Sequence, residues 1–242
     1  MKFTNFVVVL SVMSALLLSG CASLLPADEA EKKIAEPPTE SLTTLQMQVK
    51  DLQARPNLYK TQTNKHKPTA QALNQFQTAL LLKQQGKYTQ ARERFVTLSE
   101  QHPNLSGIWL QLALLAKEQD SDNSEQQAKN ITKYLNNAIS VNPLNYLAHN
   151  ELALVLRQQG QFKQALTHYE LALKSWPAFA QGYLNRGILY DLYMGKKSLA
   201  LADYELYQAL SNDDSRQLKG WIIDLQRQIK AAQQTTQTGA ML

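Results

Sequence analysis

Apolar residues recur at helical spacing in two stretches of the chain, one ahead of residue 55 and one near the C-terminus. In the first stretch, residues 41–54, the side chains of Leu42, Leu45, Val49 and Leu52 lie three or four positions apart. This spacing places side chains on one face of a helix. The sequence therefore predicts a short amphipathic helix here, which either docks on the rest of the protein or stays loose.

The second stretch, residues 213–232, has one apolar face, and most of its charges fall elsewhere. Asp213 or Asp214 can cap the N-terminus of this predicted helix. Its apolar positions are Leu218, Trp221, Ile222, Leu225 and Ile229. Such a stripe is typical of a helix that covers an apolar surface with one face and meets water with the other. The final residues, 233–242, are expected to be disordered.

Two octets between these stretches are nearly the same. QQGKYTQA at 84–91 and QQGQFKQA at 158–165 agree at five of eight positions and lie 74 residues apart. The prolines at 103, 143 and 177 are separated by 40 and 34 residues, so the octets are one longer and one shorter interval apart. Repetition of this kind is typical of a solenoid, in which each repeat stacks on its neighbour.

The 34-residue interval and the residues around it resemble the tetratricopeptide repeat, a helix-turn-helix unit. In that family the first helix carries a large, an aliphatic and then a small residue, and the second carries Ala, an aromatic residue, Ala and a final Pro. The third unit, 146–179, matches best, with Leu152, Ala153, Leu156, Gly160, Ala165, Tyr169, Ala172 and Pro177. The first unit, about 72–105, has Ala79, Leu82, Gly86, Ala91, Phe95 and Pro103, but Leu98 where a small residue is usual.

The second and fourth units depart further from the pattern. The second contains six extra residues between its halves, within 117–130. The fourth has one extra residue in its turn, Tyr207 where Ala is usual, and no terminal Pro. The resemblance implies an all-α fold, a solenoid of about four repeats over residues 69–212, followed by a capping helix at 213–232.

The N-terminus carries a different signal. Lys2 precedes an apolar stretch at 6–18, which is shorter than a membrane span and has the length of a signal-peptide core. The stretch ends in LSGC at 18–21, which resembles the lipobox of bacterial lipoproteins. In that family the signal peptide, here 1–20, is removed and the cysteine receives acyl chains. The alternatives are a signal peptide cleaved without lipidation, or an uncleaved anchor.

Cys21 is the only cysteine, so no internal disulfide can form, and lipidation gives this residue a role. No Asp follows it, which by the enteric sorting rule favours the outer membrane, with the domain facing the periplasm. Residues 22–68 hold five of the eight prolines, and their acidic residues outnumber their lysines. This composition is poor in core-forming residues and predicts a flexible tether over 21–68, apart from the short helix.

Residues for catalysis or metal binding are sparse. His66, His102, His149 and His168 are scattered, without the spacing of a metal site, and His149 and His168 are interpreted as packing or surface residues. Neither a glycine-rich phosphate loop nor a nucleophile elbow is present. The net charge of +5 is not concentrated in a basic cluster. The sequence therefore predicts no enzyme activity, no cofactor, no metal and no nucleic-acid partner.

The resemblance implies a binding surface instead. In tetratricopeptide arrays, the inner face of each first helix lines a groove, which here would combine apolar residues, amides and three cations. Leu80, Leu114 and Leu154 either line this groove or pack between helices. Asn150 and Asn185 are expected to be exposed and to bind a peptide backbone. The full set of candidate partner-binding residues is Asn150, Glu151, Arg157, Leu184, Asn185 and Ile188.

The resulting hypothesis is a periplasm-facing scaffold lipoprotein that binds a peptide segment of another envelope protein. Similar lipoproteins act in the assembly of pili and secretion complexes. The alternative is an accessory subunit or adaptor of an enzyme that processes peptidoglycan or another glycan, for which a cluster of acidic residues across the groove would be evidence. The sequence makes no prediction of oligomeric state.

Overall fold

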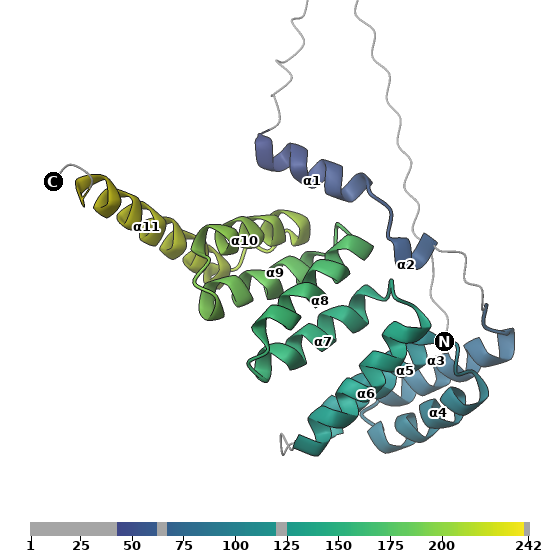
Figure 1. Ribbon diagram of the computed structural model, residues 1–242. Coiled ribbons are helices and arrows are strands. Elements are labelled where there is room, and N and C mark those ends of the chain that lie inside the picture. Colours follow the sequence, from purple (N-terminus) through teal and green to yellow (C-terminus); the bar gives the residue numbers. More distant parts are fainter. Residues whose placement is uncertain (1–42, 62–66, 120–124, 240–242) are drawn as a thin grey trace, which may run out of the picture. The chain divides into compact units, whose positions relative to one another are not determined.

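The computed structural model describes residues 43–61, 67–119 and 125–239, and throughout these ranges it consists of helices joined by short connections (Figure 1). Four helix pairs follow one another in the order that the repeat pattern predicts. They are α3 (Ala70–Gln84) with α4 (Tyr88–Gln101), α5 (Ser106–Gln119) with α6 (Glu125–Val141), α7 (Tyr146–Gln158) with α8 (Phe162–Ser175), and α9 (Ala180–Ile188) with α10 (Lys197–Ser211). The prediction of an all-α repeat solenoid is confirmed. The predicted signal peptide and Cys21 lie outside the described residues.

Small residues allow the paired helices to approach closely. Ala79, Ala153 and Ala165 are fully buried, and the large rings of Phe95 and Tyr169 are fully buried beside them. Burial of a large apolar side chain stabilises the fold by about 1.5–3 kcal/mol. The alternation of small and large residues therefore provides both the close approach and much of the packing energy of each unit.

The turn between the two helices of a unit needs a left-handed residue. Gly86 and Gly160 occupy it with φ of 73° and 74°, a conformation that costs glycine little. In the fourth unit, the corresponding residue is Gly195, with φ of 62°.

The fourth unit accommodates its extra residue before that turn. Residues Leu189–Tyr193 form a π-helical turn, η1, and the Lys196 N–H donates to the Tyr190 carbonyl at 2.8 Å. A π turn adds one residue to a helix without ending it. The insertion in the second unit lies in part at 120–124, outside the described ranges, and α6 begins directly after it at Glu125.

The C-terminal helix α11 spans Arg216–Gly239. Leu218, Ile222 and Leu225 are buried in a cluster with Tyr190 and Tyr204, as a capping helix requires. The prediction that 233–242 is disordered is wrong for 233–239, which continue α11. The reason is that no proline interrupts these residues, and extending an existing helix costs far less than starting one.

Residues 43–61 differ most from expectation. They form α1 (Thr44–Ala54) and α2 (Leu58–Thr61), so the predicted helix is present, and the predicted flexible tether is wrong for this segment. A reciprocal pair of hydrogen bonds between Thr43 and Gln46 starts α1, and Pro56 disfavours helix at the residue before it. Leu45, Val49 and Leu52 pack on a cluster of the repeat array, so the helix is docked.

Candidate functional site

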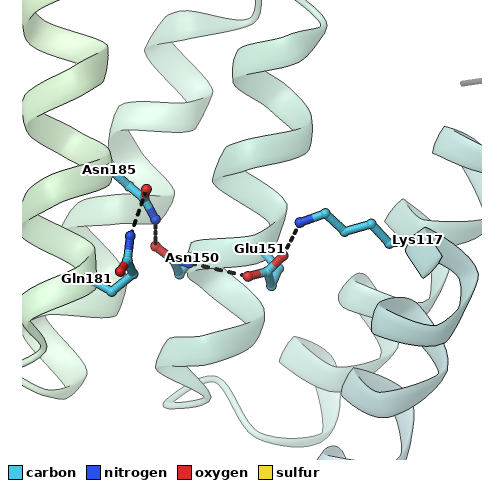
Figure 2. A network of polar contacts seen from close by, with 5 residues as sticks. All are labelled: Lys117, Asn150, Glu151, Gln181 and Asn185. Carbon is cyan, nitrogen blue, oxygen red and sulfur yellow. Dashed lines mark hydrogen bonds and ion pairs between the residues drawn. The ribbon is translucent and has the colours of Figure 1, made fainter. Parts of the chain in front are cut away.

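The first helices of successive units are joined by polar contacts. Lys83 Nζ donates to Gln111 Oε1 at 3.2 Å, from α3 to α5. Lys117 Nζ lies 3.1 Å from Glu151 Oε2, from α5 to α7. A third contact joins α7 to α9 through Asn150 and Asn185 (Figure 2). We call this row of residues the polar ladder; it follows the helices that the resemblance assigned to the groove.

Asn150 and Asn185 are buried, with 3% and 6% of their surface exposed. Asn185 Nδ2 donates to Asn150 Oδ1 at 2.8 Å, and Gln181 Nε2 donates to Asn185 Oδ1 at 3.3 Å (Figure 2). The expectation that these two amides are exposed in the free protein is therefore wrong. The α7 and α9 helices approach so closely at this point that the amide groups bind each other.

Glu151 accepts from both sides of the ladder. Its second oxygen, Oε1, lies 3.5 Å from Asn150 Nδ2, and its pairing with Lys117 leaves the two side chains 22% and 50% exposed (Figure 2). An ion pair so open to water contributes about 0–1 kcal/mol. Lys117 and Glu151 can therefore exchange their mutual contact for contacts with a bound peptide at small cost.

Arg157, in the last turn of α7, is the charged residue with the fewest partners on this face. Its guanidinium lies 5.8 Å from the centre of the Tyr193 ring. Its Nη1 is buried and has no hydrogen-bond partner within the described ranges. A guanidinium forms a strong, directional pair with a carboxylate. The geometry therefore fits an acidic group from outside the protein.

The apolar candidates are partly used by the fold. Leu184 and Ile188 are half-buried and pack against the cluster of Tyr190, Tyr204 and Leu218. The leucines at 80, 114 and 154 are also half-buried against core clusters. Packing between helices thus accounts for much of their surface, and each retains an exposed part.

Two histidines that looked isolated in sequence are neighbours in space. His149 Nδ1 lies 2.9 Å from His168 Nδ1, and His149 Nε2 lies 3.0 Å from the Pro143 carbonyl. A carbonyl only accepts, so His149 donates from Nε2 and accepts from His168 at Nδ1. Burial lowers the pKa of both, that of His168 to about 4 with a further contribution from His149. Their places in the two helices of one unit were the only signal that could have brought them together.

A buried ion pair between α9 and α10 also escaped the sequence. Arg186 Nε and Nη2 each donate to an Asp203 oxygen at 2.8 Å, and Asp203 is 3% exposed. The rings of Tyr183 and Tyr190 lie 5.6 and 5.7 Å from the guanidinium. Burial raises the pKa of Asp203, and Arg186 opposes this. The pair fastens the helices of the fourth unit and is structural.

Within the described residues, no group of three or more His, Cys, Asp or Glu side chains is arranged to hold a metal ion. In the same ranges, no helix has the length and apolar character needed to cross a membrane.

Comparison with known proteins agrees with this geometry. The tetratricopeptide repeat family matches residues 133–180 and 151–215. PilF from Pseudomonas aeruginosa superposes with a TM-score of 0.56 at 18% identity, over 66% of this chain and 69% of that one. A thermophilic TPR protein from Thermus thermophilus has a TM-score of 0.52 at 20% identity, over 69% and 84%. The MamA protein has 0.50 at 15%, over 70% and 94%. No curated protein matches the chain in sequence.

These likenesses, all below 25% identity, concern the fold. The protein is a tetratricopeptide-repeat protein, with its family match in the second to fourth units and the same helical architecture in the first. Repeats of this kind act as scaffolds for protein–protein interaction, because stacked units offer an extended surface.

Proposed function

We propose that this protein is a lipid-anchored scaffold that binds a peptide segment of another envelope protein on the face that carries the polar ladder. The observation behind this proposal is Arg157, whose buried Nη1 has no hydrogen-bond partner among the described side chains. Since a buried donor without a partner costs about 1–3 kcal/mol, a ligand that supplies an acceptor gains that much.

The polar ladder suggests what the peptide looks like. A carboxylate pairs with Arg157, and Lys117 and Glu151 lie one unit away from α9 for a second polar contact. The exposed parts of Leu184 and Ile188 receive an apolar side chain. Asn150 and Asn185 support this face by holding α7 and α9 together.

The location is proposed from the N-terminal motif. LSGC at 18–21 and the presence of a single cysteine support lipidation of Cys21, and the absence of a following Asp supports the outer membrane, facing the periplasm. Two or more acyl chains give firm anchoring. We place the protein in the assembly of a pilus or secretion complex, the role of similar lipoproteins.

Replacement of Cys21 tests the anchor. Cys21→Ser leaves an unprocessed precursor without acyl chains, and the unmodified protein incorporates labelled palmitate and fractionates with the outer membrane. Palmitate incorporation by Cys21→Ser would exclude this assignment.

An adaptor or accessory subunit of a glycan-processing enzyme is the alternative. It predicts acidic residues grouped across the ladder face. In the described part of α7, Glu151 is instead paired with Lys117 and followed by the cation Arg157. The charge of this face therefore favours an acidic peptide over a catalytic subunit.

Site-directed photo-crosslinking in envelope fractions tests the face. A photoreactive residue at position 117 or 154 is expected to trap one partner at a defined peptide, which mass spectrometry identifies. Lys163 and Thr167, exposed on α8, provide matched control positions. Equal trapping from the α7 and α8 positions would count against the proposal.

A further inference from the structure

A cluster of aromatic rings lies where the third unit meets the fourth. Tyr146 begins α7, and Trp176 and Phe179 lie in the connection from α8 to α9. The Tyr146 ring lies 5.0 Å from that of Trp176 and 4.8 Å from that of Phe179, and the latter two are 5.7 Å apart. We call these three rings, with Tyr183, Leu206, Tyr207 and Leu210 around them, the aromatic cradle. Its members belong to the repeats and hold one another in place.

The segment 43–61, which we call the strap, occupies this cradle. Leu45, Val49 and Leu52 of α1 pack on it. After Pro56, Tyr59 meets Tyr146 edge to face at 6.0 Å, and Lys60 Nζ lies 6.0 Å from the centre of the Trp176 ring. The cradle thus holds an amphipathic helix with apolar residues at i, i+4 and i+7, followed seven residues later by an aromatic ring and then a cation.

The strap is held lightly. Leu52 is the one residue of α1 that is buried, whereas Met47 on the same helix is 53% exposed. The strap's ion pair, Arg55 with Asp51, is internal, and within the described ranges no ion pair joins strap to repeats. Asn57 Nδ2 is buried without a hydrogen-bond partner in the described part of the chain. A helix of 11 residues is marginal by itself.

We propose that the aromatic cradle is a second recognition surface, for an amphipathic helix of a partner protein with the strap's pattern, and that the strap is its built-in competitor. This surface differs from the polar ladder and goes beyond the function proposed for that face. Because the strap is tethered, its effective concentration is in the millimolar range, and a partner must bind the open cradle more tightly than the strap. A helix that lacks the unpaired amide of Asn57 meets that condition.

The experiment uses a fluorescent peptide of residues 43–61 and the full-length mature chain. In the chain, Val49→Asp with Leu52→Asp places two carboxylates against the cradle and releases the strap. We expect this variant to bind the peptide at least tenfold more tightly than the unmodified chain. Met47→Asp is the matched control, because Met47 is exposed on the same helix, and it is expected to behave as the unmodified chain.

The peptide has its own control. A peptide that carries Val49→Asp and Leu52→Asp is expected not to bind the opened chain. If the opened chain binds neither peptide, or the unmodified chain binds the original peptide equally well, the proposal is wrong. An unmodified chain that is already a dimer with exchanged straps also contradicts it, since the competitor would then come from a second copy.

Hydrogen exchange on the unmodified chain provides a test that needs no variant. Amides of α1 are expected to exchange faster than those of α8 and α9, because the strap opens while the repeats stay folded. Equal protection of all three helices would show that the strap is a fixed part of the fold. Arg157→Gln is expected to leave peptide binding by the opened chain unchanged, which separates this proposal from that for the polar ladder.

Discussion

At the scale of the residue, the polar ladder shows how far a repeat register determines the role of a side chain. The register placed Asn150 and Asn185 on the correct helices, but the structure buries both and joins them at 2.8 Å. Sequence position defines the face of a helix, and the distance between neighbouring helices is set by packing over the whole unit. The same limit concealed the contact of His149 with His168, 19 residues apart.

Asn185→Ala is expected to lower the free energy of unfolding by about 1–3 kcal/mol, because Asn150 Oδ1 is left buried without its donor. Denaturant titration measures the change. Gln181→Ala removes an exposed amide of the same network and is expected to change stability by less than about 0.5 kcal/mol. Two equal unfolding midpoints would mean that the buried amide pair contributes nothing.

The histidine pair predicts a dependence of stability on pH. Folding lowers the His168 pKa from 6.5 to about 4, so between these values the unfolded chain binds more protons than the folded one. This contribution to stability is complete above pH 6.5 and is lost as the pH falls toward 4. The melting temperature of His168→Gln is therefore expected to decrease less than that of the unmodified protein between pH 7.5 and 5. Parallel decreases would contradict this role for His168.

At the scale of the element, the sequence predicted what repeats and missed what occurs once. Gly86, Gly160 and the alanines recur at family positions, so their helices and turns were predictable. The π turn at Leu189–Tyr193 was visible only as one extra residue, since sequence does not show whether a loop or a helix absorbs it. The docking of the strap depends on an aromatic cluster assembled from two units, which no local pattern reveals.

Gly187 shows how closely the helices of the fourth unit approach. A Cβ at this position would lie 2.7 Å from Cε1 and 2.8 Å from Cδ1 of Tyr204. Gly187→Ala is therefore expected to destabilise the protein by about 1–3 kcal/mol through overpacking.

Gly220→Ala is the matched control, because a Cβ there meets no atom within 4 Å and Gly220 lies inside α11. It is expected to stabilise the helix by about 0.5–1 kcal/mol. Thermal melting of both variants distinguishes the cases, and a stabilised Gly187→Ala would contradict the close approach.

At the scale of the whole molecule, the described chain is a row of helix pairs in which each unit packs on the next, and α11 covers the last. Such an array has no enclosed active site, and its long face is suited to an extended or helical peptide. The repeat fold was predictable because its period is written in the sequence. The identity of the partner was not, since binding depends on a few exposed groups that vary between repeat proteins.

The central claim is that the ladder face binds an acidic peptide through Arg157. The most direct measurement is the dissociation constant of the crosslinked partner peptide for the unmodified protein, Arg157→Gln and the α8 control Lys163→Gln, with melting curves for all three. Because a charge-assisted hydrogen bond contributes about 1.5–3 kcal/mol, Arg157→Gln is expected to weaken binding at least about tenfold without lowering the melting temperature. Lys163→Gln is expected to bind as the unmodified protein does. Equal dissociation constants for all three proteins would contradict the claim.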